Sequence, residues 1–247
     1  MQTPKFFALI IGTEILNRRR SDAHFEFISK TLIKHNHKLT GSFIIEDDPK
    51  LITDTIKFIA SIPDSVLFSF GGIGSTPDDY TRECASKALS DGKLYTHPKA
   101  KEIIESKLGD KAYPHPINMA KLPKDAKLLD NPINGMPAFY VNDRFFFMPG
   151  FPQMSHPMVE HILSYIIDDG RVNYRKTLTA NCKENVFIEL MQKVPDNVEV
   201  SSLPKLYDNG WATTISVNSY DKELTDSIFE EFVSLLDSLD ISYKIGN

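Results

Sequence analysis

The stretch FSFGGIGSTPDDYT, from Phe68 to Thr81, places three glycines at the end of an apolar run and two adjacent aspartates shortly after the glycines. The run SVLFSF (65–70) has the length and apolar character of a strand that is covered on both faces. A glycine loop between such a strand and a helix is a common binding place for an anion in parallel α/β sheets. No lysine follows the glycines, so the loop is not a P-loop, and the dinucleotide fingerprint belongs after the first strand of its fold.

The chain on either side of this loop alternates between strand and helix patterns. Because consecutive βαβ units are right-handed and build parallel sheets, this order predicts an α/β domain with a mostly parallel sheet. The predicted strands are 6–11, 39–45 and 65–70, and the predicted helices are 21–35, a second from about 49, and 77–89.

The remainder of the chain predicts the rest of this domain and a second, smaller one. A helix at 97–108 is followed by a loop over 110–137, two short strands at 138–141 and 145–148, and a helix at 153–168. The acidic turn at 168–170 predicts a boundary between domains at 1–170 and 171–247. Beyond it we expect strands at 174–181, 198–203, 211–217 and 240–245 and helices at 184–193 and 221–238. That βαββαβ order is the ferredoxin-like arrangement of a small α+β domain.

Composition narrows the function classes. A net charge of −5 argues against a nucleic-acid partner, whose binding face is usually basic. No stretch is long and apolar enough for a membrane span, so we expect no membrane partner. Cys84 and Cys182 lack metal-ligand spacing, and a reduced, cytoplasmic setting is the simplest expectation.

The acids after the glycines have a structural interpretation as well as a functional one. Thr76-Pro77-Asp78-Asp79 reads as a helix start, with the threonine at the N-cap and Asp79 at the third helical position. Capping leaves the three glycines unexplained, so the loop stays a candidate phosphate site.

Two further segments follow the first two strands and are therefore expected at the same edge of the sheet. GTEILNRRRSD (12–22) carries an arginine triplet, which suits a bound phosphate but is equally consistent with a solvated turn. In IIEDDP (44–49), Asp47 or Asp48 could cap the next helix. Alternatively, Asp47 and Asp79 could together hold a divalent ion, which would turn the repulsion of phosphate by the acids into bridging.

Several motifs, in order, resemble the MoaB/Mog molybdopterin-binding family, and most closely the amino-terminal domain of the CinA (competence-damage-inducible) group. They are GTEIL, Asp47 in IIEDD, GGIGSTPDDYT, THP (96–98), MAKLPKDAKLLDNP (119–132) and MPGFP (148–152), and they span about residues 5–165. Short members of the group also carry RRxDxHF and TRxCA, present here from Arg19 to Phe25 and from Thr81 to Ala85.

The resemblance implies a three-layer α/β/α fold that binds molybdopterin or a nucleotide phosphate, and relatives in the group commonly form homo-oligomers. It associates Asp47 and Asp79 with activity, as catalytic residues and ligands of Mg²⁺ or a similar ion, and implies hydrolysis of a pyrophosphate of the ADP-ribose or FAD type. Together with the loop pattern it assigns the small-molecule phosphate ligand to Gly12, Thr13, Glu14, Arg19, Arg20, Asp22, Gly71, Gly72, Gly74, Ser75, Thr76, Thr81, Pro149 and Gly150.

The chain departs from the family pattern at three positions. Arg18 stands where close relatives have glycine, Ser75 where proline or alanine is usual, and Met154 where the group has glutamate. Position 78 is aspartate rather than the arginine of Mog proteins, which disfavours adenylylation of molybdopterin. The alternatives to a pyrophosphatase are therefore a pterin- or nucleotide-binding module without turnover and, less favoured, a protein of molybdenum cofactor biosynthesis.

Overall fold

The computed structural model describes residues 4–167, 170–208 and 210–246. The chain divides into two compact units, Met1–Asp168 and Asp169–Asn247. Each unit has a hydrophobic core of its own. The first two residues of the predicted 168–170 boundary lie outside the described residues.

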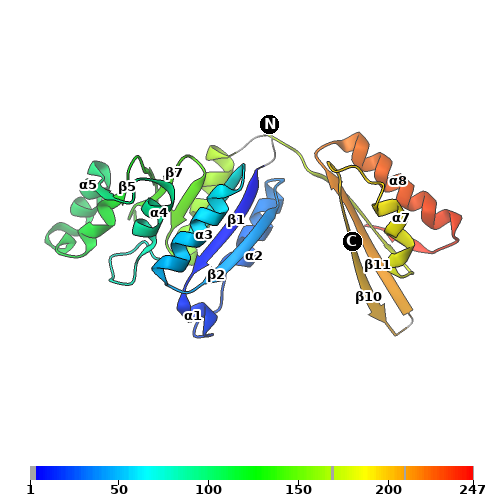
Figure 1. Ribbon diagram of the computed structural model, residues 1–247, viewed down its shortest axis with the longest axis horizontal. Helices are drawn as coiled ribbons and strands as arrows, with labels where there is room; N and C mark the ends of the chain where they lie inside the picture. Colours follow the sequence, from blue (N-terminus) through cyan, green and yellow to red (C-terminus); the bar gives the residue numbers. More distant parts are fainter. Residues whose placement is uncertain (1–3, 168–169, 209, 247) are drawn as a thin grey trace. The chain divides into compact units, whose positions relative to one another are not determined.

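A six-stranded, mostly parallel sheet forms the centre of the first unit (Figure 1). Its order is β2-β1-β3-β8-β7-β6, in which the first four strands are mutually parallel and the last two run antiparallel to their neighbours. The strands are β1 (Lys5–Ile11), β2 (Leu39–Ile45), β3 (Ser65–Phe70), β6 (Lys127–Leu129), β7 (Ala138–Val141) and β8 (Phe145–Met148). All six residues of β3 are buried, as its apolar run predicts.

Helices cover both faces of this sheet and make the unit three-layered (Figure 1). α2 (His24–Lys34) packs on α6 (Pro152–His161), and α3 (Pro49–Ser61) packs on α4 (Thr81–Leu89). The chain moves from β1 outward to β2 and then back past β1 to β3, so two right-handed crossovers place α2 and α3 on opposite faces. The predicted α/β/α class is therefore confirmed.

Three predictions about local structure in this unit are wrong. The helix predicted at 77–89 begins only at Thr81, after a turn over 76–80. The helix predicted at 153–168 is α-helical only to His161 and continues as a π-helical segment, Ile162–Ile166. The predicted loop at 110–137 contains short 3₁₀ helices and strands, and a short helix, α1 (Thr13–Leu16), follows β1 without having been predicted.

These small elements extend one side of the unit. They are β4 (Leu94–Thr96), α5 (Pro98–Leu108), η1 (Gly109–Ala112), η2 (Pro116–Ala120) and β5 (Lys121–Pro123). β4 and β5 form an antiparallel pair, and β5 also contacts α4. This subassembly carries His115 and Lys121 to the side of α4.

The second unit has an antiparallel sheet of order β10-β11-β9-β12, the strand order of the predicted ferredoxin-like arrangement. Its elements are β9 (Tyr174–Ala180), η4 (Glu184–Phe187), α7 (Ile188–Met191), β10 (Glu199–Tyr207), β11 (Gly210–Ser219), α8 (Lys222–Ser238) and β12 (Tyr243–Ile245). α8 packs on β9 and β11 through Phe229 and Phe232. Among the described residues, no helix of either unit has the length and apolarity that crossing a membrane requires.

Candidate functional site

The carboxyl ends of β1, β2, β3 and β8 meet at one edge of the sheet. Ile11 is paired with Ile45, and Ile10 with Phe70, so the segments that follow these strands start side by side. The amide of Gly71 donates to the carbonyl of Met148 at 2.9 Å, which extends the β3–β8 ladder to the last residue of β8. The parallel register therefore brings the glycine loop, the GTEIL segment, the acids after β2 and the Pro149-Gly150 turn together, as expected of this fold class.

The first two glycines of the loop are required by close packing. Gly71 has φ +107°, and a Cβ there would lie 2.5 Å from the carbonyl oxygen of Ile11. Gly72 has φ +68°, and its Cβ would lie 2.2 Å from the hydroxyl of Thr81. That hydroxyl donates to the carbonyl of Gly71 at 3.0 Å and is fully buried. Thr81, assigned to the ligand from sequence, thus closes the loop from within.

Arg82 holds the second half of the loop, a role that the sequence analysis did not assign. Its Nη1 donates to the carbonyls of Ile73 and Gly74, while its side chain is buried. Burial lowers the pKa of the guanidinium from its ordinary value, although guanidinium groups stay protonated in proteins. The loop therefore turns its carbonyls inward onto a buried cation.

The turn after the loop is built by Asp79 and is not a helix cap. One carboxylate oxygen, Oδ2, accepts from the amide of Thr76 at 2.8 Å and from its hydroxyl at 2.6 Å. A Cβ on Gly74 would lie 2.5 Å from the same oxygen, so this third glycine makes room for the carboxylate. Thr76 and Pro77 accordingly do not start α4, and the sequence interpretation of TPDD as a helix start is corrected.

The two aspartates after β2 have separate roles. Asp48 caps α3, because its Oδ1 accepts from the amide of Leu51 at 2.6 Å. Asp47 turns to the neighbouring segment, where its Oδ2 accepts from both the amide and the hydroxyl of Thr13 at 2.8 Å. The capping alternative for the pair is thus decided in favour of Asp48.

Arg20 and His24 converge on the Pro149-Gly150 turn. Nη2 of Arg20 donates to the carbonyl of Gly150 at 3.0 Å, and Nη1 lies 3.7 Å from Oε1 of Glu14. Nε2 of His24 lies 3.4 Å from the same carbonyl, and its ring stacks on Phe70. Burial lowers the pKa of His24 to about 4, so this imidazole is neutral near neutral pH.

These groups surround a cavity of about 570 Å³, which we call the glycine-loop cavity. The predicted ligand residues that line it are Glu14, Arg20, Asp47, Gly71, Gly72, Gly74, Ser75, Thr76, Asp79, Pro149 and Gly150. Gly12, Thr13, Arg19, Asp22 and Thr81 do not line it. Of these, Asp22 accepts from the amides of His24 and Phe25 at the start of α2, and Arg19 bonds Asn17 on the surface.

A further wall of the cavity comes from residues that the sequence analysis did not assign to the ligand. It consists of Met119, Asn131, Asn134, Met136, Pro137, Phe151 and Met154. Asn131 is buried, and its Nδ2 is a donor without a hydrogen-bond partner among the described residues. The sequence signals for this wall were the motif matches over 119–132 and 148–152, since asparagine beside proline by itself reads only as a turn.

The cavity carries more negative than positive charge. Glu14, Asp47, Asp78 and Asp79 line it together with one cation, Arg20. Oδ2 of Asp47 accepts hydrogen bonds from Thr13, and Oδ2 of Asp79 accepts them from Thr76. The Oδ1 atoms of both aspartates accept no hydrogen bond from a described residue. Within the described ranges, no cluster of three or more histidine, cysteine, aspartate or glutamate side chains is close enough to bind a metal by itself.

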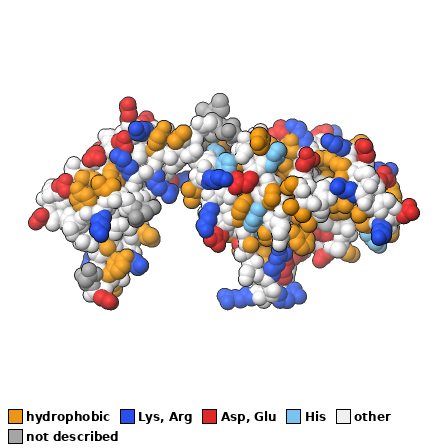
Figure 2. Space-filling view, turned by 180° about the vertical axis from the view of Figure 1, so that it is seen from behind, with side chains coloured by type: hydrophobic (Ala, Val, Ile, Leu, Met, Phe, Trp, Pro, Cys, Tyr) orange, Lys and Arg blue, Asp and Glu red, His pale blue; other side chains and the backbone are white. Residues whose placement is uncertain are grey.

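Arg18 lies in the left-handed backbone region that glycine adopts most easily, with φ 59°. Its side chain is exposed, as is that of Arg19. Figure 2 shows basic side chains gathered at the end of the first unit, where Figure 1 draws α1. The triplet therefore contributes Arg20 alone to the cavity lining.

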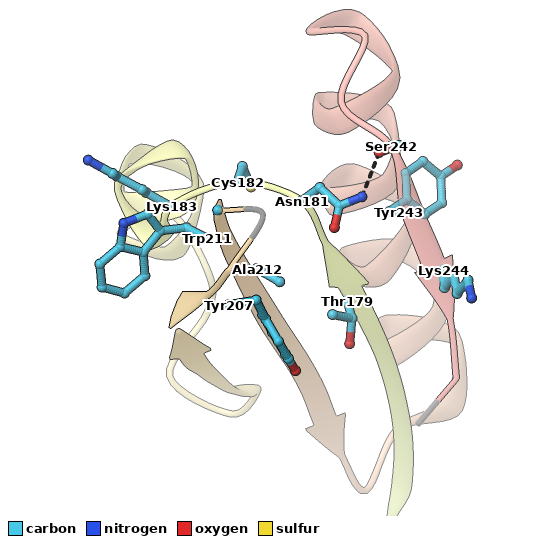
Figure 3. Close-up of a pocket in the computed structure, with 11 residues that line it drawn as sticks. Thr179, Asn181, Cys182, Lys183, Tyr207, Trp211, Ala212, Ser242, Tyr243 and Lys244 are labelled. Atoms are coloured by element: carbon cyan, nitrogen blue, oxygen red, sulfur yellow. Dashed lines mark hydrogen bonds between the residues drawn. The ribbon is translucent and has the colours of Figure 1, made fainter. Parts of the chain in front are cut away.

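A larger hollow, of about 840 Å³, lies in the second unit between the ends of β9, β10, β11 and β12 (Figure 3). Asn181 donates to the hydroxyl of Ser242 at 2.8 Å, so these polar groups satisfy each other. Figure 3 shows Lys183 and Lys244 on opposite sides of the hollow, and its lining contains no carboxylate. Charged groups do not converge here as they do in the glycine-loop cavity, although the hollow is larger.

The chain is similar to known proteins in sequence and in fold. The family described as "Probable molybdopterin binding domain" matches residues 7–169. A protein from Archaeoglobus fulgidus is 28% identical over 236 residues, which cover 94% of this chain and 98% of that relative. A CinA-like protein from Desulfotalea psychrophila is 33% identical over 165 residues, 63% of this chain, and the match covers 38% of that protein's length. The crystal structure of the protein CinA with unknown function from Thermoplasma acidophilum superposes with a TM-score of 0.59 at 25% identity, over 66% of this chain and 98% of that one.

Proposed function

Because the chain belongs to the family of the probable molybdopterin binding domain, we propose that it binds a phosphate-bearing pterin or nucleotide in the glycine-loop cavity and hydrolyses a dinucleotide pyrophosphate. The substrate is of the ADP-ribose or FAD type, and the reaction uses a divalent metal ion. Water adds to one phosphorus atom, and the bridging oxygen leaves with the other phosphate, so that two monophosphates are formed.

The charge of the cavity carries this proposal. A backbone loop at the carboxyl edge of a parallel sheet suits phosphate, yet four carboxylates and one arginine line the same space. A pyrophosphate would be repelled there unless a cation accompanied it. The presence of both features in one cavity supports a metal-bound phosphate ligand.

The residues present fit such an ion. Mg²⁺ is commonly held by one or two carboxylates together with substrate phosphates and water, and so does not need a cluster of three protein ligands. Asp47 and Asp79 would hold it through their unengaged oxygens, with Glu14 close by on the same lining. When bound, the ion would neutralise phosphate charge and favour attack by water.

The chain's own groups would bind and orient the substrate. Arg20 would pair with a phosphate, and Nδ2 of Asn131 would donate to an acceptor on the ligand. Met119, Met136 and Phe151 offer apolar surface to a flat ring. Asp79, held by Thr76, would orient the attacking water from a fixed position.

Hydrolysis of ADP-ribose and FAD with Mg²⁺ or Co²⁺ tests the proposal. We expect Asp79→Asn and Asp47→Asn each to lower kcat by about 100-fold or more, as for loss of an acid–base or metal-binding group. An asparagine oxygen can still accept the hydrogen bonds from Thr76 or Thr13, so the local turns survive. Asp48→Asn is the matched control and retains the wild-type rate, since asparagine also caps helices. Wild-type rates in Asp79→Asn would refute the role given to this residue.

A binding module without turnover is the second candidate. It is favoured by the fact that Oδ2 of both Asp47 and Asp79 already has structural hydrogen bonds, so that each aspartate has a purpose without catalysis. Ligand-dependent melting without hydrolysis of any member of a dinucleotide panel would support this alternative.

A further inference from the structure

A second cavity, of about 360 Å³, lies on the other side of the turn that follows the glycine loop. It shares Ser75, Thr76 and Asp79 with the glycine-loop cavity, so one short stretch of chain separates the two spaces. Its other walls come from α4, η2 and β5. The second cavity was not anticipated from the sequence.

Arg82 supplies a buried positive charge to the second cavity. The residue is only 5% exposed, and its Nε is buried with no hydrogen-bond partner among the described residues. Its Nη1 bonds two loop carbonyls, but it forms no ion pair with any described carboxylate. The carboxylates of Glu83 and Asp79 favour the charged form of Arg82 from a distance without a direct ion pair, and a ligand anion in this cavity would add to that compensation of its burial.

The rim of the second cavity adds further cationic and polar groups. Lys121, in β5, and His115, just before η2, are both exposed, and neither has an ion-pair partner among the described residues. The acids on the lining are Asp79, which faces both cavities, and Glu83 of α4. The lining of the second cavity therefore carries Arg82, Lys121 and His115 against two carboxylates, Asp79 and Glu83.

We propose that one ligand occupies both cavities, with its flat ring in the glycine-loop cavity and a phosphorylated sugar in the second cavity, held by Arg82, Lys121 and His115. The methionine and phenylalanine side chains lie only in the first cavity, whereas the second is lined mainly by polar and charged groups. The phosphate linkage crosses the turn at Ser75 and Thr76, beside Asp79. This inference rests on the proposed function, because it assigns the two halves of that substrate.

Calorimetric binding with Mg²⁺ present tests the assignment. The probes are AMP, which fills the first cavity alone, and a methylene-bridged analogue of ADP-ribose that cannot be hydrolysed. We expect the analogue to bind wild-type protein about 10-fold more tightly than AMP, as one charge-assisted contact would give. Lys121→Ala and His115→Ala should remove most of that advantage and leave AMP affinity within about 2-fold. Lys124→Ala, an exposed lysine outside both linings, is the matched control.

The outcomes separate this inference from the proposed function. Equal weakening of AMP and the analogue, or no change in either, would overturn the two-cavity assignment even in an active pyrophosphatase. The assignment would likewise be overturned if wild-type protein bound neither probe. Selective weakening of the analogue supports the assignment even if no hydrolysis of natural dinucleotides is found, in which case only the catalytic proposal fails. Because Lys121 and His115 are exposed, we expect both alanine variants to fold. Circular dichroism would show whether they do.

Discussion

Gly72 illustrates how closely the loop is packed onto the helix that follows it. A methyl group there would lie 2.2 Å from Oγ1 of Thr81, at a φ of +68° that L-residues rarely adopt. Gly92 also has a positive φ, +79°, but a Cβ there would meet nothing closer than 3.9 Å. Alanine at position 92 would therefore cause backbone strain alone, whereas alanine at position 72 would cause backbone strain and a steric overlap with Thr81.

We expect Gly72→Ala to lower the free energy of unfolding by about 2–4 kcal/mol, the sum of strain and overpacking. Gly92→Ala should cost only about 1 kcal/mol, from backbone strain. Urea denaturation of both variants measures the difference. Equal losses would mean that the loop relaxes away from Thr81.

His24 makes the stability of the first unit depend on pH. Its pKa is lowered from 6.5 to about 4 by burial, so the unfolded chain binds more protons than the folded chain between these values. Its stabilising contribution is complete above pH 6.5 and is lost as the pH falls toward 4. The groups that face it are His156, Asp22, Arg20 and the carbonyl of Gly150.

Replacing His24 with glutamine, which does not titrate, should remove the contribution of this residue to the pH dependence of stability. We expect the stability of wild-type protein relative to His24→Gln to fall by about 1–3 kcal/mol between pH 7 and pH 4. Denaturation at several pH values measures both proteins. Parallel profiles would show that the imidazole is not held neutral in the fold.

At the scale of the element, the two adjacent aspartates at the junction of β2 and α3 have different roles. Asp48 caps the helix, while Asp47 reaches the amide of Thr13 across the sheet edge. A strand end and a helix start overlap here, so one residue serves the helix and the other serves the site.

Alanine at each position should show the division. Asp48→Ala is expected to lower stability by about 1 kcal/mol, as loss of an N-cap, with substrate turnover or binding unchanged. Asp47→Ala should abolish turnover and metal-dependent binding. Denaturation and hydrolysis assays on the two variants give the comparison, and loss of activity in Asp48→Ala would place the cap in the site instead.

The whole molecule has two separate hydrophobic cores, one in each unit. The glycine-loop cavity and the second cavity are lined only by residues of the first unit. Ligand binding should therefore stabilise that unit alone.

Calorimetric heating of the full chain should show two transitions. A saturating, non-hydrolysable ligand with Mg²⁺, at about 100 times its Kd, is expected to raise the Tm of one transition by about 5–10 °C and to leave the other in place. The same scan without ligand is the control. A single transition, or equal shifts of both, would show that the units unfold together.

Elements whose cause is local could be predicted from the sequence. The apolar run of β3 and the stripe of Ile52, Ile56 and Ile59 in α3 are patterns of neighbouring residues, and the structure confirms both elements. The start of α4 was missed because Thr76 and Asp79 satisfy each other in a turn, which has the same sequence signature as a capping box. The 3₁₀ helices and short strands within 110–137 were missed because their pairing partners are distant, as β4 is for β5.

The sequence alone determined the α/β class, the glycine loop and the presence of acids at one edge of the sheet, because strand order and hydrophobic spacing decide where strand ends meet. Only the tertiary structure decided which aspartate caps and which faces the cavity, that Arg82 supports the loop, and that Asn131 completes the far wall. Each of these depends on where a side chain meets another segment, as Asp47 meets Thr13 across 34 residues of sequence. Local residue patterns do not predict such contacts, because they form only when the folded chain packs closely.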